Sequence, residues 1–248
     1  MLHQHAIQCL HDPILMLLSY VVSVLGSFTA LQLAIAIPAA RDARQRWTAI
    51  AWAGAAMGGG AIWAMHFIAM IACWMDLQVS YDLGITAASA VIGIVSCMAG
   101  LAIASAGVFR WGKLLLAGAF MGLGVTGMHY TGMAAMLMAA DTHYDAVLVA
   151  ASAAIAIVAS IVALWLAFHL RGTWQMLGSA LVMGVAVCGM HYTGMQAATF
   201  VHNGRQDVET GLSGGNLGVG IFVVTTVLLA VMLSTSLMRQ RQRNLVQI

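Results

Sequence analysis

Long apolar stretches separated by short polar clusters run through the whole chain. They cover residues 13–36, 48–74, 83–108, 113–139, 146–169, 174–200 and 216–238. A transmembrane helix needs about 20 apolar residues to cross the roughly 30 Å hydrocarbon core of a bilayer. Each stretch is continuously apolar and does not alternate with polar positions, which disfavours a membrane β-barrel. The pattern predicts an all-α polytopic membrane protein with seven transmembrane helices.

The composition supports this prediction and excludes two classes of function. Hydrophobic residues make up 62% of the 248 residues and charged residues only 7%, against roughly a quarter in ordinary soluble domains. So few charges could not cover the surface of a cytosolic globular enzyme. The formal net charge of +2 is too small for a nucleic-acid binder. Cys9, Cys73, Cys97 and Cys188 form no CxxC pair, so we expect neither a disulfide framework nor a zinc finger.

The charged residues between the stretches predict the orientation in the membrane. All basic residues except Arg205 fall on one side of the predicted helices. The acidic residues on the other side are Asp12, Asp76, Asp82, Asp141, Asp145, Asp207 and Glu209. The basic set is Arg41, Arg44, Arg46, Arg110, Lys113, Arg171, Arg239, Arg241 and Arg243. Because cytoplasmic loops carry the excess of Lys and Arg, the N-terminus is expected outside and the C-terminus in the cytoplasm.

One motif recurs in the second, fourth and sixth stretches. It reads Ala-Met-His-Phe-Ile-Ala-Met at 64–70 and Gly-Met-His-Tyr-Thr-Gly-Met at both 127–133 and 189–195. The histidines are 63 and then 62 residues apart, and each unit is an inward helix followed by an outward one. Parallel repeats are related by an axis along the membrane normal. We therefore expect three parallel two-helix repeats in a pseudo-threefold arrangement, with the seventh helix appended.

Each motif places a histidine and a methionine four residues apart, on one face of its helix. The pairs are His66/Met70, His129/Met133 and His191/Met195. Seven residues before each histidine is a glycine (Gly59, Gly122, Gly184), which permits close approach between helices. Facing a common axis, these helices would bring three imidazoles and several thioethers together in the outer half of the membrane. Imidazole and thioether select soft or borderline metals, and copper is the leading one.

Two alternatives apply to single residues of this set. A lone intramembrane histidine can be a hydrogen-bonded packing residue, and methionine often fills irregular gaps. Repetition at equivalent positions favours metal ligands, the histidines ahead of the thioethers. Tyr130 and Tyr192 are expected to orient a neighbouring group by hydrogen bonding.

A candidate accessory metal site lies at the outer end, at His3, His5 and His11. There Met1-Leu2-His3 offers the square-planar nitrogens suited to Cu(II). The alternative is that these are solvated loop histidines.

These residues resemble the MHYT family, named for the tetrad seen here at 128–131 and 190–193. The resemblance implies a seven-helix sensor domain of the bacterial cytoplasmic membrane over 1–238, followed at 239–248 by a basic tail or the start of a linker. It implies copper binding, sensing of oxygen, nitric oxide or carbon monoxide, and cytoplasmic GGDEF or EAL output domains of cyclic-di-GMP signalling. The implied ligands are Met65, His66, Met70, Met128, His129, Met133, Met190, His191 and Met195. The first copy departs from the tetrad at Phe67 and Ile68.

Three classes of function follow from this sequence. A metal-dependent membrane sensor, responding to a diatomic gas or to copper itself, explains the repeated ligands and the basic C-terminal end. A transporter or channel for copper or another small solute is the alternative, but the residues below the motifs are mostly Gly, Ala and Val, without a ladder of ligands. An enzyme is not expected, because no Ser-His-Asp arrangement, P-loop or carboxylate pair can be identified.

Overall fold

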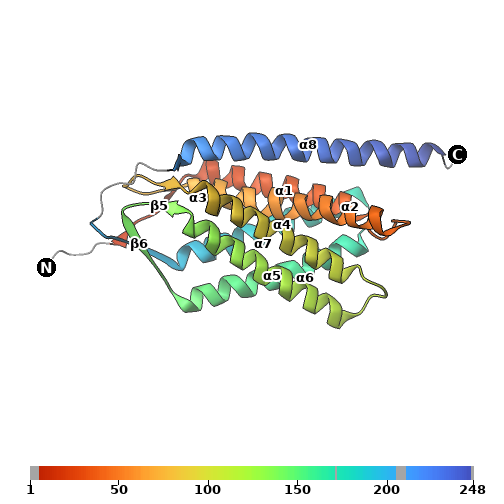
Figure 1. Ribbon diagram of the computed structural model, residues 1–248, viewed down its shortest axis with the longest axis horizontal. Coiled ribbons are helices and arrows are strands. Elements are labelled where there is room, and N and C mark those ends of the chain that lie inside the picture. Colours follow the sequence, from red (N-terminus) through yellow and green to blue (C-terminus); the bar gives the residue numbers. More distant parts are fainter. Residues whose placement is uncertain (1–5, 171, 205–210, 247–248) are drawn as a thin grey trace.

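The computed structural model describes residues 6–170, 172–204 and 211–246. The helices form one elongated bundle with the C-terminal helix along its side (Figure 1). They are α1 (Pro13–Ala34), α2 (Ala43–Gly54), η1 (Ala55–Trp63), α3 (Ala64–Ile71), α4 (Leu83–Ala104), α5 (Trp111–Ala134), α6 (Ala146–His169), α7 (Thr173–Gln196) and α8 (Gly214–Val246). Within the described ranges, seven helical segments are long and apolar enough to cross a membrane, which confirms the predicted fold class.

The second span is one continuous helix with a π-helical middle. It runs over Ala43–Ile71, and η1 takes its wider turns in a segment that contains Gly58, Gly59 and Gly60. Met57 lies nine residues before His66, whereas the corresponding methionines of α5 and α7, Met121 and Met183, lie eight before theirs. A π-helical turn takes up one additional residue. The π-helix therefore keeps both ends of this span in register with the other repeats, which the sequence pattern did not predict.

Each of α1, α4 and α6 begins with the same capping arrangement. The carboxylates of Asp12, Asp82 and Asp145 accept hydrogen bonds from backbone N–H groups in the first turn of their helices. This satisfies donors that a helix N-terminus leaves unpaired. The backbone N–H of each Asp also donates to the last turn of the outward helix of its own repeat, at distances of 2.8, 2.9 and 2.9 Å. In each two-helix unit, this hydrogen bond joins the start of the inward helix to the end of the outward helix.

Short strands cover the end of the bundle at which α1, α4 and α6 begin, here called the strand end (Figure 1). They form three small sheets, β1-β7-β6, β2-β3 and β5-β4-β8. The strands are β1 (Ala6–Ile7), β2 (Leu10–His11), β3 (Cys73–Trp74), β4 (Ser80–Tyr81), β5 (Met136–Leu137), β6 (Ala140–Tyr144), β7 (Ala198–His202) and β8 (Leu212–Ser213). No strand was predicted, because these polar connections are too short to show a period of alternating residues.

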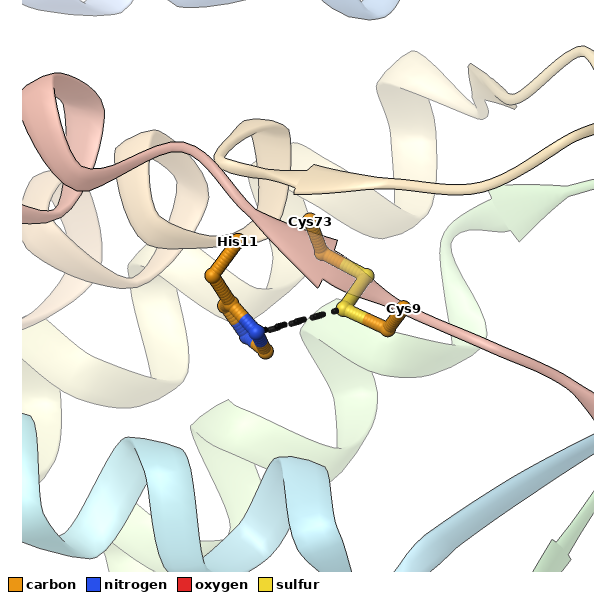
Figure 2. Close-up of a disulfide and its surroundings, with 3 residues drawn as sticks. All are labelled: Cys9, His11 and Cys73. Atoms are coloured by element: carbon orange, nitrogen blue, oxygen red, sulfur yellow. Dashed lines mark hydrogen bonds between the residues drawn. A yellow bond between two sulfur atoms is a disulfide. The ribbon is translucent and has the colours of Figure 1, made fainter.

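A disulfide joins Cys9 to Cys73 at this end of the bundle (Figure 2). Antiparallel pairing of β2 with β3 sets His11 opposite Cys73 and so brings together two cysteines that are 64 residues apart in sequence. The cysteines were expected to form no disulfide framework, and this single disulfide was not predicted, because spacing along the chain carries no information on this strand pairing. Cys97 and Cys188 are free thiols.

Neighbouring repeats pack through glycines of the outward helices. A Cβ added to Gly58 would overlap the backbone of α4, one added to Gly122 the backbone of α6, and one added to Gly184 the side chain of Val24 in α1. Each outward helix therefore contacts the inward helix of the next repeat, and the contacts close a ring. In the first repeat the closest approach falls at Gly58, not at the predicted Gly59, because η1 shifts the register by one residue.

The opposite end of the bundle carries the basic residues of the short loops, and is called the basic end here. The Arg46 guanidinium donates to the Ala102 carbonyl at 3.2 Å and to the Ser105 hydroxyl at 3.1 Å, at the C-terminus of α4. The Lys113 ammonium donates to the Ala106 and Val108 carbonyls. Cations at a helix C-terminus donate hydrogen bonds to its free carbonyls and interact favourably with the helix dipole. Arg171 and the side chains of 239–248 lie outside the described residues.

Candidate metal centre

The repeat histidines meet inside the bundle, although they come from three different helices. His66 of α3, His129 of α5 and His191 of α7 are at most 1% exposed. The His66 Nδ1 atom lies 3.0 Å from His191 Nδ1 and 3.1 Å from His129 Nδ1. One ligand atom from each ring can be chosen so that all lie within 4.8 Å of one another. We call these residues the histidine triad.

Hydrogen bonds alone do not account for both short contacts of the His66 Nδ1 atom. A neutral imidazole carries one N–H and one lone pair, so His66 Nδ1 can form only one ordinary hydrogen bond, yet it faces two partners. A central cation would accept lone pairs from all three nitrogens. Nitrogens bound about 2 Å from one ion lie roughly 3 to 3.5 Å apart, close to the separations seen here. The donor set therefore fits a metal ion.

The other ring nitrogens point away from the centre. None of the three Nε2 atoms has a hydrogen-bond partner among the described residues, although all are buried. An unsatisfied buried polar group costs about 1–3 kcal/mol, and such groups call for a functional explanation in a native structure. Three at equivalent positions argue against histidines that serve packing alone.

Glycines give the rings room. A Cβ added to Gly132 of α5 would overlap His66 Nε2, and one added to Gly194 of α7 would overlap His129 Nε2. Each glycine follows the histidine of its own motif by three residues and accommodates the ring from the preceding repeat. The equivalent position of the first motif, three residues after His66, is Ala69. The motif glycines thus have a steric role that the sequence pattern did not show.

The six motif methionines are all buried and flank the triad along the bundle. Met70, Met133 and Met195 belong to the hydrophobic cluster at the strand end. Met128 and Met190 belong to the cluster on the basic side, and Met65 is 1% exposed. The methionines that follow the histidines and two of those that precede them therefore lie on opposite sides of the imidazoles along the bundle, in two hydrophobic clusters.

In two of the three repeats an aromatic side chain near the histidine forms a hydrogen bond with a serine of the inward helix. The predicted hydrogen bond of Tyr192 is not formed, since its buried hydroxyl has no partner among the described residues. The Tyr130 hydroxyl forms a 2.9 Å hydrogen bond with Ser152 of α6. Phe67 has no hydroxyl at the equivalent position, but the Trp63 indole N–H donates to Ser89 of α4 at 3.0 Å. A residue one turn earlier thus replaces the missing tyrosine hydroxyl in the first repeat.

A cavity of about 40 Å³ lies among the spans and is lined almost wholly by apolar side chains. Met57, Met121 and Met183, which are equivalent in the three repeats, line it together with Met190. Ala and Val recur in this lining, as expected of the residues below the motifs, but the methionines among them were not anticipated. The regular methionine eight or nine residues before each histidine was the signal in the sequence that pointed to this lining.

The predicted accessory set is only partly described. His3 and His5 lie outside the described residues, so the site proposed for them stays a prediction. His11 is exposed and its ring contacts Tyr192, whose ring contacts His191, with centroids 5.5 and 5.0 Å apart. These contacts connect the surface of the strand end to the triad.

Comparison with known proteins identifies the family. The MHYT model, described as "Bacterial signalling protein N terminal repeat", matches the chain at residues 59–117, 122–180 and 184–245. The chain belongs to the MHYT family. The family model matches three times in succession, and each match begins at one of the glycines Gly59, Gly122 and Gly184. No solved structure matches the chain.

MHYT relatives are larger signalling proteins. The bifunctional diguanylate cyclase/cyclic di-GMP phosphodiesterase MucR of Pseudomonas aeruginosa is 37% identical over 93% of this chain and 34% of MucR. The cyclic di-GMP phosphodiesterase NbdA of the same organism is 33% identical over 86% of this chain and 28% of NbdA. The signaling protein YkoW of Bacillus subtilis is 29% identical over 77% of this chain and 24% of YkoW. The chain thus spans about a third of the length of these relatives or less.

Proposed function

We propose that this MHYT domain is a metal-dependent membrane sensor whose metal, copper, is held by the histidine triad. The observation that carries the proposal is the convergence of His66, His129 and His191 on one buried point, with Nδ1 atoms 3.0 and 3.1 Å apart. Copper suits both imidazole and thioether, and buried methionines lie on either side of the rings. No enzymatic role is assigned to this chain.

The signal is a diatomic gas bound at the metal, or copper itself. The apolar cavity supports the gas because its volume of about 40 Å³ exceeds the roughly 10–15 Å³ needed for one water. Its apolar lining suits oxygen, nitric oxide or carbon monoxide better than water. Met190, which precedes His191, belongs to that lining, so a small molecule there would be next to the triad.

The path of the signal leads through η1 to α8. His66 is the third residue of α3, directly after the π-helix, and a Cβ added to Gly60 of η1 would lie 2.8 Å from Leu229 of α8. A movement of His66 would therefore alter the contact that α8 makes with the rest of the bundle. Such coupling requires the ligand to bind two helix arrangements with different affinity.

The output is proposed to be cyclic-di-GMP signalling in the cytoplasm, as the printed names of MucR and NbdA suggest. In this proposal residues 1–238 are the sensor domain, and 239–248 are a basic tail or a linker to a GGDEF or EAL output domain.

A copper transporter is the second candidate function. The methionines that line the cavity would provide soft ligands beyond the triad.

A spin label tests the sensor directly. With a label on Leu237→Cys, in a Cys97→Ala/Cys188→Ala background, nitric oxide should change the label's mobility in copper-bound protein and leave it unchanged in apo-protein. Leu237 is exposed near the basic end of α8; a label on Val158→Cys, exposed on α6, is the control and should not respond. Equal spectra with and without gas in verified copper-bound protein would contradict gas sensing. If the spectra of the copper-bound protein and the apo-protein were also the same, the transporter would be the favoured function.

We further propose that the strand end faces outward and the basic end faces the cytoplasm of a bacterial inner membrane. Two observations support this orientation. The loops at the basic end carry most of the Arg and Lys residues, and cytoplasmic loops are enriched in these residues. The disulfide lies at the strand end, and disulfides persist in oxidising compartments. A reporter that is active only in the cytoplasm should function when fused after Ile248 and fail when fused after Asp145. The reverse pattern would overturn the orientation.

A further inference from the structure

We propose that Cys9, Cys73 and His11 form a second soft-metal site, which opens when their disulfide is reduced. The Cys9 Sγ atom lies 3.5 Å from His11 Nε2 and 3.7 Å from Nδ1, and Cys73 Sγ is bonded to it. Figure 2 shows the imidazole beside the sulfurs. Two thiolates and an imidazole are ligands that Cu(I) and Zn²⁺ prefer.

The backbone holds the ligands together whether or not the sulfurs are bonded. His11 pairs with Cys73 across β2 and β3, and the Asp12 N–H donates to the Ala72 carbonyl at 2.8 Å. Cys73 is 7% exposed within the hydrophobic cluster of the strand end, so its position does not depend on the disulfide alone. His11 is exposed, which leaves the site accessible from the surface.

The redox step balances with a dithiol as the reductant. The dithiol supplies two electrons and two protons; the Cys9–Cys73 bond breaks, two thiols form, and the dithiol becomes its own disulfide. A metal ion then binds the two sulfurs as thiolates, and both protons are released to solvent. The reverse exchange closes the site again: the disulfide form of the dithiol takes up the two electrons and two protons, and the Cys9–Cys73 bond re-forms. Because Tyr192 lies between His11 and His191, the reduced site would stand between the surface and the triad.

The test compares oxidised and reduced forms of the same protein. After reduction with dithiothreitol and anaerobic removal of the reagent, a titration with Cu(I) should give about one more bound copper per chain than the oxidised form. The increment should disappear in Cys9→Ser and in Cys73→Ser, and His11→Ala should weaken it by roughly tenfold or more. Circular dichroism should be unchanged by reduction, since the seven spans do not depend on this bond.

Matched variants separate this site from the free thiols and from the triad. Cys97→Ala and Cys188→Ala remove the other cysteines and should leave the increment intact. Copper that the oxidised wild type binds and oxidised His129→Ala loses belongs to the triad, so absence of such binding would contradict the proposed function without affecting this proposal. An increment that is absent from well-folded reduced protein, or that survives in Cys9→Ser and Cys73→Ser, would overturn it.

Discussion

Replacing any one triad histidine with alanine should lower copper affinity by roughly a hundredfold or more. Loss of a group that merely supports a ligand costs about 10- to 100-fold, and His66, His129 and His191 would be direct ligands. The fall should be largest for His66, because its Nδ1 atom makes both short contacts to the other rings. Metal analysis and competitive Cu(I) titration of the purified, oxidised variants measure the effect.

The chain offers a matched control for this experiment. His169 is exposed at the end of α6, so His169→Ala removes an imidazole without touching the centre and should bind copper as the wild type does. Met98→Leu, outside the motif helices, should do the same. Full copper occupancy in a folded protein that lacks all three triad histidines would leave them as packing residues and end the proposal of a metal centre there.

Alanine in place of Gly132 or Gly194 should lower copper affinity by roughly tenfold or more, although it adds only one methyl group. The new Cβ would overlap His66 Nε2 or His129 Nε2 and would push that ring out of its position. A displaced ligand costs at least as much as a lost supporting group, about 10- to 100-fold. The same Cu(I) titration, together with a thermal melt, measures affinity and stability separately.

The controls are Gly127→Ala and Gly189→Ala, on the same two helices. A Cβ at either position meets nothing within 4 Å, and alanine raises helix propensity by about 1 kcal/mol over glycine. These variants should therefore bind copper normally and be at least as stable as the wild type. If Gly132→Ala binds copper as Gly127→Ala does, the rings are not confined by the motif glycines, and the steric account of the triad is wrong.

The pattern of apolar residues and the repeated motif were enough to predict the helices, their number and the three histidines that meet inside the bundle. Stretches longer than the bilayer is thick must be helical, because lipid offers no partner for backbone hydrogen bonds. The three equivalent histidines were identified because repeats that share an orientation place equivalent residues at one depth. Their spacing could not show that the rings touch through Nδ1, since this depends on rotamers and on how closely three helices approach.

Features that link residues far apart in sequence could not be predicted and depend on how the elements pack together. Pairing of β2 with β3 placed Cys9 against Cys73, and the π-helix moved the close glycine contact from Gly59 to Gly58. Trp63 took over the hydrogen bond to Ser89 that Phe67 cannot make. The physical reason is the same in each case: local patterns record which face of a helix is apolar, whereas the identity of the neighbour is set by packing between elements.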